Sequence, residues 1–277
     1  MLKTRVITAV LLLAVIIPAL LWLPPRGWAL LVLVFLVGAA WEWARLCGYV
    51  GARVYVLPAL VAGGAGLLLA YPPGAAPGDA CLILVALLWV LVVPAWLRWR
   101  DRVPTGLPLA LTGWVVLLAC WYAVWRARES GAAYLFLLMG TVWIADITAY
   151  FAGKAFGRNK LAPAISPGKT WEGVIGAVIG VQLFAVICVL IQARVPNYFG
   201  ALAGAAGWAG ALLAALLLTG VSVIGDLFES LLKRRAGIKD SSNLLPGHGG
   251  VLDRVDALLS TLPVALAIPA LLGMVKT

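Results

Sequence analysis

Charged residues are scarce in this sequence. Asp, Glu, Lys and Arg make up 12% of the 277 residues, whereas about 25% is usual in soluble domains. The hydrophobic fraction is 64% and the mean hydropathy is +1.03. A water-soluble chain has no means of burying so much apolar surface, so the composition excludes a soluble globular protein.

Cysteine and histidine are also rare. The four cysteines, Cys47, Cys81, Cys120 and Cys188, stand singly in or beside apolar segments, and His248 is the one histidine. Without a CxxC pair or a second histidine, the chain has no ligand set for a Cys/His metal cluster. We therefore expect the cysteines to be small core residues.

Long apolar runs occupy most of the chain. A helix needs about 20 residues to cross roughly 30 Å of hydrocarbon, and we predict nine transmembrane helices at about 6–23, 27–44, 55–71, 80–98, 107–126, 132–151, 173–192, 203–228 and 257–275. The expected fold is all-α, a polytopic integral membrane helical bundle. We expect the first run to be retained, because it lacks the small-residue cleavage site of a signal peptide.

Basic residues are unevenly distributed between alternate loops. With a cytoplasmic N-terminus, sixteen of the 21 Lys and Arg residues lie on the cytoplasmic side, and the other five, including Lys276, lie opposite. The positive-inside rule favours this orientation. We predict a multi-pass protein of the cytoplasmic membrane whose net charge of +10 faces anionic lipid head groups. Without a soluble basic domain, we expect no nucleic-acid binding.

Acidic residues are concentrated in the second half, which holds seven of the eleven Asp and Glu residues. We therefore interpret residues 1–131 as a transmembrane scaffold and residues 132–277 as a transmembrane catalytic region with cytoplasmic active-site loops. Gly176 and Gly180 form a small-residue pattern that allows close helix packing.

Three polar segments interrupt the second half, at 143–150, 153–173 and 225–256. Asp146 lies in the first of them, inside an apolar run, where an ionisable group is costly and indicates function by default. We expect all three segments at the cytoplasmic end of the membrane, with the middle one as a loop.

Several polar side chains recur at helical spacing: Asp226, Glu229 or Ser230, and Lys233 in one stripe, then Asp253 and Asp256 on the next helix. Converging carboxylates are what Mg²⁺ requires, because this cation takes carboxylate, phosphate and water oxygens. Any single member of such a set, or Asp240 beside Lys239, is equally compatible with an ordinary interfacial charge.

The segment from Gly247 to Gly250 suits an anionic ligand, because its glycines let backbone N–H groups, including that of Gly249, come close to phosphate. Charge-assisted donors are available from Lys233, Arg234, Arg235 and Lys239. We expect His248 to orient the loop or to contact phosphate; a structural turn histidine is the alternative. The combination indicates phosphoryl or nucleotidyl transfer involving a lipid.

Two stretches, SLLKRRAGIKD at 230–240 and LPGHGGVLDRVD at 245–256, resemble the C-terminal signature of phosphatidate cytidylyltransferases, also called CDP-diacylglycerol synthases. The stretch GRNKLAPAISPGKTWEG at 157–173 is similar to the other polar segment of that family. Strong similarity covers about 140–257; before that, only the helical, apolar character and the stretch WEWAR at 41–45 agree with the family. The resemblance implies a Mg²⁺-dependent reaction of CTP with phosphatidate that yields CDP-diacylglycerol and pyrophosphate.

The resemblance also implies residue roles. Asp226 and Asp253 are implied as metal ligands in a paired cation site. A monovalent cation such as K⁺ is a candidate for the second ion of that site. Asp256 is implied as a further ligand or orienting residue, and Lys233 completes the catalytic set. The implied substrate-binding residues are Arg234, Lys239, Asp240, His248, Gly249, Ser166, Lys169, Glu172 and Asp146. A homodimer is implied as well, which the sequence neither shows nor opposes.

Two other functions stay open on the residues alone. A CTP-dependent lipid kinase would use similar metals and cations but transfer the γ-phosphoryl group. A transporter is the alternative from a different class, although transporters tend to place polar groups near the membrane midplane. A CDP-alcohol phosphotransferase is excluded, because its motif needs an Asp-Gly pair and the chain has none.

Overall fold

The computed structural model describes residues 2–274, with side chains described from residue 6 onward. The α-helices are α1 (Leu2–Trp22), α2 (Pro25–Leu46), α3 (Val56–Ala70), α4 (Ala75–Leu87), α5 (Val93–Arg98), α6 (Gly106–Glu129), α7 (Ala132–Phe156), α8 (Trp171–Ile191), α9 (Tyr198–Arg235) and α10 (Leu252–Leu271). The remaining elements are η1 (Gly51–Tyr55), the π-helical turn η2 (Leu88–Val92), η3 (Arg100–Arg102), β1 (Lys160–Ala162) and β2 (Ser166–Thr170).

The predicted polytopic helical bundle is confirmed. Within the described residues, eight helices are long and apolar enough to cross a membrane, and Val6–Trp22 is a shorter apolar helix. Together they match the nine predicted runs. The fourth run is covered by α4, η2 and α5, which follow one another without a break from Ala75 to Arg98.

Helix α9 departs most from its predicted bounds of 203–228. It begins at Tyr198, changes direction at Gly207, whose φ of 71° suits only glycine, and continues to Arg235. The last turns of α9 extend past the apolar run. Leu, Lys and Arg are good helix formers in water as well, so the helix continues there. This extension keeps the stripe from Asp226 to Lys233 helical.

The polar segment 153–173 was predicted as a loop, and this is wrong in detail. Helix α7 continues to Phe156, and β1 and β2 then form an antiparallel hairpin in which Lys160 is opposite Thr170. The hairpin leads directly into α8, whose start is capped by the side chain of Thr170 accepting from the N–H of Gly173 at 3.2 Å. Local pairing thus gives this polar backbone its hydrogen bonds.

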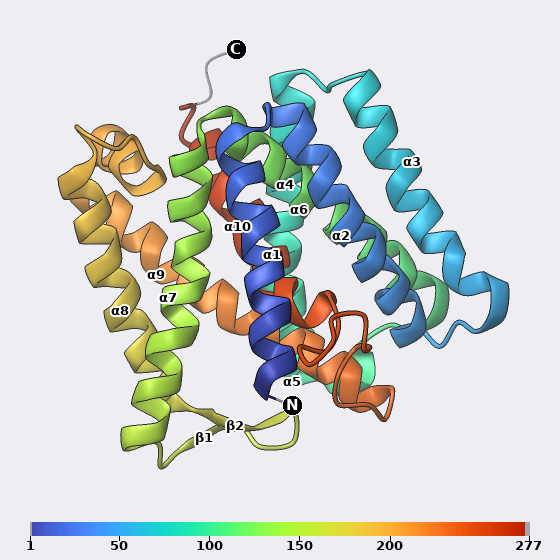
Figure 1. The fold of residues 1–277 in the computed structure, drawn as a ribbon. Coiled ribbons are helices and arrows are strands. Elements are labelled where there is room, and N and C mark those ends of the chain that lie inside the picture. The colour runs from blue at the N-terminus through green and yellow to red at the C-terminus, as the bar shows by residue number, and fades with distance from the viewer. Residues whose placement is uncertain (1, 275–277) are drawn as a thin grey trace.

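Helices α7 and α8 pack at close range through glycine, as the Gly176 and Gly180 pattern predicted. A Cβ atom on Gly176 would overlap that of Ala152, and one on Gly180 would overlap the side chain of Thr148. The two helices therefore form a close pair that carries the hairpin at its end (Figure 1).

Helix α9 crosses the bundle over an aromatic core. The Phe228 ring lies 6.2 Å from that of Trp43, 5.8 Å from Trp89 and 5.7 Å from Trp96, measured between centroids. These contacts join α9 to helices of the N-terminal half. Packing of this kind fixes the position of the α9 face that carries the polar stripe.

The four cysteines do not all behave as predicted. Cys47, Cys120 and Cys188 are buried, which confirms them as small core residues, but Cys81 is exposed. Cys81 lies on α4, whose outer face is apolar and suits a thiol facing lipid.

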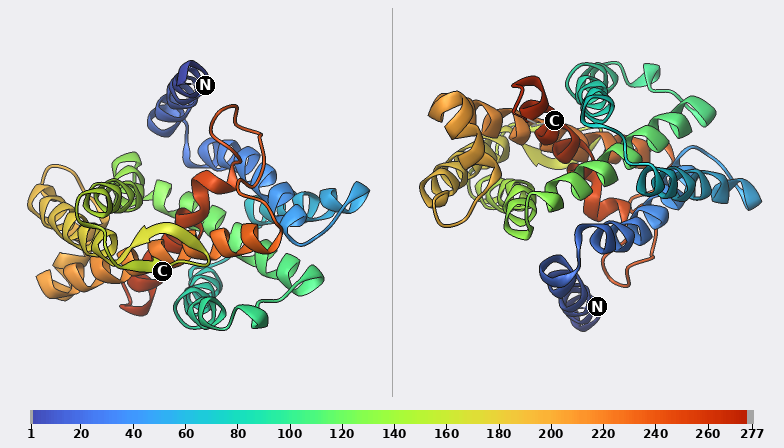
Figure 2. Two further views of the ribbon diagram at one scale, coloured as in Figure 1. Left: turned by 90° about the horizontal axis from the view of Figure 1, so that it is seen from below. Right: turned by 90° about the horizontal axis from the view of Figure 1, so that it is seen from above.

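The polar segments gather at one end of the bundle. Figure 1 shows the hairpin, the C-terminal end of α9 and the N-terminal end of α10 together at that end. Figure 2 shows α1 at the periphery, apart from most of the other helices. The three segments therefore lie at a common end, as predicted. Lys276, which we predicted on the opposite side, lies outside the described residues.

Candidate active site

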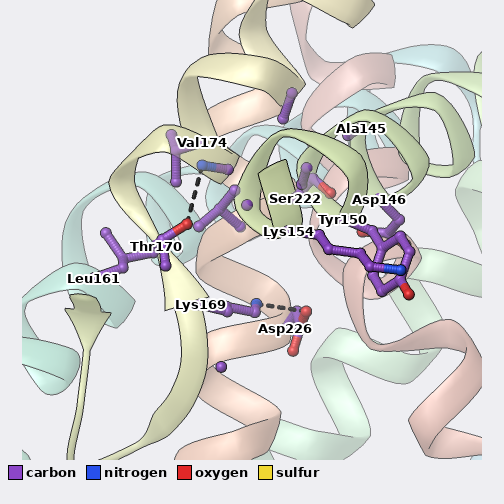
Figure 3. A pocket seen from close by; sticks show the side chains of 16 residues that line it. Ala145, Asp146, Tyr150, Lys154, Leu161, Lys169, Thr170, Val174, Ser222 and Asp226 are labelled. Atoms are coloured by element: carbon purple, nitrogen blue, oxygen red, sulfur yellow. Dashed lines mark hydrogen bonds and ion pairs between the residues drawn. The ribbon is translucent and has the colours of Figure 1, made fainter. Parts of the chain in front are cut away.

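A cavity of about 460 Å³ lies at this end between α7, α8, the hairpin and α9. Its charged lining consists of Asp146 and Lys154 from α7, Lys169 from β2 and Asp226 from α9, and we call these four residues the cavity cluster (Figure 3). Ligand sites in proteins commonly have volumes of about 300–1,000 Å³. The cavity is therefore large enough for a small phosphorylated head group.

An ion pair between Lys169 and Asp226 spans the cavity from hairpin to helix (Figure 3). The other oxygen of Asp226 accepts weakly from the hydroxyl of Ser230 at 3.4 Å. On α7, the ammonium of Lys154 lies 5.9 Å from the centre of the Tyr150 ring, within cation–π range. The cavity cluster thus presents two cations and two carboxylates to a ligand.

A second polar group lies further along α9, and we call it the loop cluster: Glu229, Lys233, Ser241, Gly250 and Asp253. The ammonium of Lys233 lies 2.5 Å from Glu229 Oε2 and 2.7 Å from Asp253 Oδ1. Asp253 also accepts from the Ser241 N–H and hydroxyl, both at 3.0 Å, and from the Gly250 N–H at 2.8 Å. Both oxygens of Asp253 are therefore occupied by protein donors.

Asp256 lies close to the cavity cluster. Its carboxylate interacts electrostatically with those of Asp226 and Asp146, and one of its oxygens accepts from the N–H of Ala257 at 2.8 Å. Along α9, Asp226 and Lys233 are separated by about 10 Å at 1.5 Å per residue. The site therefore has two centres about 10 Å apart, with Asp256 near the first.

The glycine-rich loop is closed by its own backbone. The N–H of Leu245 donates to Gly249 O at 2.9 Å, and the N–H of His248 donates to Leu245 O at 2.8 Å. Arg254 donates to the carbonyl of His248 at 2.7 Å. We predicted that amides of this loop approach phosphate, but those of His248 and Gly250 are already used within the protein.

The remaining predicted residues lie around these centres. Arg234 donates to Ile165 O at 3.2 Å, which joins α9 to the hairpin turn. Glu172 accepts from the Asn159 side chain at 2.8 Å and so closes the base of the hairpin. Lys239 and Asp240 are exposed, Ser166 lies partly buried on β2, and His248 Nδ1 is buried without a partner among the described residues. Arg234, Glu172 and Ser166 do not line the cavity.

Two polar residues near the site were not predicted from the sequence as part of it. Lys154 was assigned only to membrane topology, yet it lines the cavity. Glu42 of α2 is completely buried and accepts hydrogen bonds from the start of α10. A lone carboxylate in an apolar run, the signal that singled out Asp146, also applied to Glu42.

Comparison with known proteins identifies similar chains along the whole length. Residues 3–272 match the model of a family described as the cytidylyltransferase family. The chain is 41% identical over 282 residues to the phosphatidate cytidylyltransferase of Pseudomonas aeruginosa, covering 97% of both. It is 34% identical to that of Haemophilus influenzae, covering 95% of this chain and 96% of the relative. It is 38% identical to that of Brucella abortus, covering 94% and 90% respectively.

Proposed function

The chain belongs to the cytidylyltransferase family, and on that premise we propose that it makes CDP-diacylglycerol and pyrophosphate from CTP and phosphatidate. The observation that supports this function most strongly is the cavity cluster. Its cations and carboxylates line a cavity at one end of membrane-crossing helices, where a charged nucleotide and a lipid phosphate can meet.

The proposed reaction needs little covalent chemistry from the protein. A phosphate oxygen of phosphatidate attacks the α-phosphorus of CTP, and the bond from that phosphorus to the bridging oxygen breaks. Pyrophosphate leaves with the electron pair. Because the second pKa of a phosphate monoester is about 6, the attacking oxygen is already ionised near neutral pH. The protein therefore has to position the phosphates and neutralise their charge.

The two centres suggest how the substrates are divided. The cavity lies between α7, α8 and α9, and the exposed side chains of Phe151 and Ile175 give its surroundings an apolar outer surface. We assign the lipid phosphate to this cavity, with Lys154 and Lys169 as its cations. The triphosphate then extends toward the loop cluster, with the exposed Lys239 and the partly buried His248 nearby in sequence.

Magnesium fits the carboxylates of the cavity. Asp146 and Asp226 line the cavity, and Asp256 lies near them outside its lining. All three offer hard oxygen donors, and Lys169 is the one cation within the described residues that forms an ion pair with any of them. We propose that Asp226 and Asp256 hold Mg²⁺, which when bound neutralises phosphate charge. The role of Asp253 as a metal ligand stays a prediction. In this structure both of its carboxylate oxygens accept from Lys233 or from the loop. A second cation such as K⁺ also stays a prediction.

The orientation and assembly of the protein follow from weaker arguments. We propose that the site faces the cytoplasm, because most loop Lys and Arg residues lie on its side of the membrane. A homodimer stays a prediction from the resemblance.

Product identification with two acceptors tests the proposed function. Purified protein with CTP and Mg²⁺ should convert phosphatidate to CDP-diacylglycerol, identified by mass spectrometry, and should leave diacylglycerol unchanged. Phosphorylation of diacylglycerol would instead indicate the kinase. No product from either lipid, with folded protein, would contradict both activities and favour a transporter.

A further inference from the structure

Glu42 is a buried carboxylate without a cationic partner. It lies on α2 and is 0% exposed, and none of the ion pairs among the described side chains includes it. A charge buried in this way is costly unless hydrogen bonds compensate for it. Its donors must therefore be found in the surrounding structure.

Those donors come from a segment about 200 residues away in the sequence. The N–H groups of Val251 and Leu252 donate to the Glu42 carboxylate at 3.0 and 2.6 Å, and the hydroxyl of Ser242 donates as well. Val251 and Leu252 lie at the N-terminus of α10, where free N–H groups and the helix dipole favour a negative charge. The buried charge is thus compensated by the end of one helix.

The residues that Glu42 holds are direct neighbours of the loop cluster. Ser242 follows Ser241, and Val251 and Leu252 separate Gly250 from Asp253 in the chain. There is no spare room at this contact, because a Cβ atom on Gly250 would overlap both Glu42 and Ser241. A shift of the Glu42 carboxylate therefore displaces the groups that orient Asp253.

We propose that Glu42 is a positioning residue for the transfer reaction. Its carboxylate fixes the start of α10, so that Asp253 stays in hydrogen-bonding distance of Lys233 while substrate binds. Glu42 itself touches no reacting group. This inference rests on the proposed function, and it adds a residue from the N-terminal half to the machinery of the site.

The same contact limits how α10 can bind phosphate. A helix N-terminus is a common anion site, but the Glu42 carboxylate already accepts from Val251 and Leu252. The start of α10 therefore binds an anion of the protein itself. Triphosphate recognition therefore falls to cationic side chains near the loop cluster, such as the exposed Lys239, and not to the amides at this helix end.

The test is the full-length variant Glu42→Gln, matched by Glu129→Gln as a control. Gln keeps the size but replaces one acceptor oxygen by an NH₂ donor, which faces the N–H groups of α10. Glu129 is an exposed carboxylate paired with Arg126 at 3.0 Å, away from the site. Two measurements are made on each protein: kcat and KM for CTP, and hydrogen–deuterium exchange.

We expect Glu42→Gln to lower kcat by about 10- to 100-fold, as is typical when a supporting hydrogen bond behind an active site is lost. The KM for CTP should change little. Amide exchange should rise in peptides covering 241–253 and stay unchanged in α6. The control should match wild type in both measurements.

Two results would overturn the proposal: a kcat close to wild type, or exchange that rises evenly through the molecule. If Glu42→Gln does not fold, Ser242→Ala decides in its place, with a smaller fall in kcat and the same local rise in exchange expected. A wild-type kcat in Ser242→Ala would then contradict the proposed role of Glu42. If wild-type protein lacks cytidylyl transfer, the proposed function fails, while the exchange data still test the placement of α10.

Discussion

Asp226 and Asp253 are both carboxylates of the site, but their surroundings give them different tasks. Asp226 pairs with Lys169 at the cavity and interacts electrostatically with Asp256. Asp253 accepts from Lys233 and from the loop that precedes α10. Asp226 thus has the surroundings of a metal ligand, and Asp253 those of an anchor for Lys233.

A magnesium titration separates these tasks. Asp226→Asn and Asp256→Asn should raise the Mg²⁺ concentration for half-maximal activity by about tenfold or more, because each removes a hard oxygen donor. Asp253→Asn should lower the maximal rate without a comparable shift in that concentration. A large shift in Asp253→Asn would show that Asp253 binds the metal, as the family resemblance implies.

Asp253→Asn should lower kcat by about 100-fold or more, which corresponds to roughly 2.7 kcal/mol of lost transition-state stabilisation. The amide leaves Lys233 with Glu229 as its one carboxylate, and its NH₂ group faces the donors of the loop. Turnover is measured on folded, membrane-inserted protein, with the exposed Asp101→Asn as the control. Near-normal turnover in Asp253→Asn would contradict the role of the loop cluster.

The sequence pointed to three members of the cavity cluster, Asp146, Lys169 and Asp226, and to Lys233 and Asp253 of the loop cluster, but not to the contacts between them. Lys233 and Asp253 belong to a contiguous signature, so a motif was enough to find them. The contact of Lys169 with Asp226 joins residues 57 positions apart, and it depends on a hairpin whose register no local pattern specified. Glu42 carried a local signal as a lone carboxylate in an apolar run, but its contact with the start of α10 was not predictable, because its partners are remote in sequence.

Among the elements, the pair α7 and α8 determines the shape of the cavity. Both helices contribute to its wall, and β2 adds Lys169 at its opening. Their separation is set by Gly176 and Gly180, where the backbones approach closely. The cavity therefore depends on small residues that lie among and beside the residues of its lining.

Gly176→Ala should destabilise this pair by about 1–3 kcal/mol, because the new Cβ overlaps Ala152 and the neighbouring backbone of α7. The midpoint of thermal unfolding in detergent should fall, and the KM for phosphatidate should rise. Gly66→Ala in α3 is the matched control, because its added Cβ has nothing within 4 Å. An unchanged midpoint in Gly176→Ala would contradict the close packing.

Helices were predictable here and the hairpin was not. Hydrophobic length identified all nine apolar runs, since crossing the membrane imposes a minimum length on each helix. The ends of α7 and α9 lie beyond the apolar runs, where that constraint no longer operates. Segment 153–173 contains prolines and glycines that read as a loop, whereas its pairing depends on contacts with α8 and α9.

At the scale of the whole molecule, basic residues are concentrated at one end of the bundle. Most Lys and Arg residues and the candidate site lie at the same end, as Figure 1 shows for the hairpin and α10. The division into a scaffold of residues 1–131 and a catalytic region of residues 132–277 stays a prediction. Glu42 and the aromatic contacts of Phe228 show that the two halves share one core.

Membrane vesicles of opposite orientation test the predicted direction. Inverted vesicles that contain phosphatidate should convert CTP added outside, because their cytoplasmic face is exposed. Right-side-out vesicles should do so only after permeabilisation, since CTP does not cross the bilayer. Turnover by sealed right-side-out vesicles would place the site on the opposite face.

Positional labelling of CTP tests the central claim most directly. Purified protein is supplied with phosphatidate, Mg²⁺ and CTP labelled at either the α- or the γ-phosphate. Cytidylyl transfer predicts that the α label enters the lipid and that the γ label leaves as pyrophosphate. Entry of the γ label into lipid would contradict this account and make the protein a kinase.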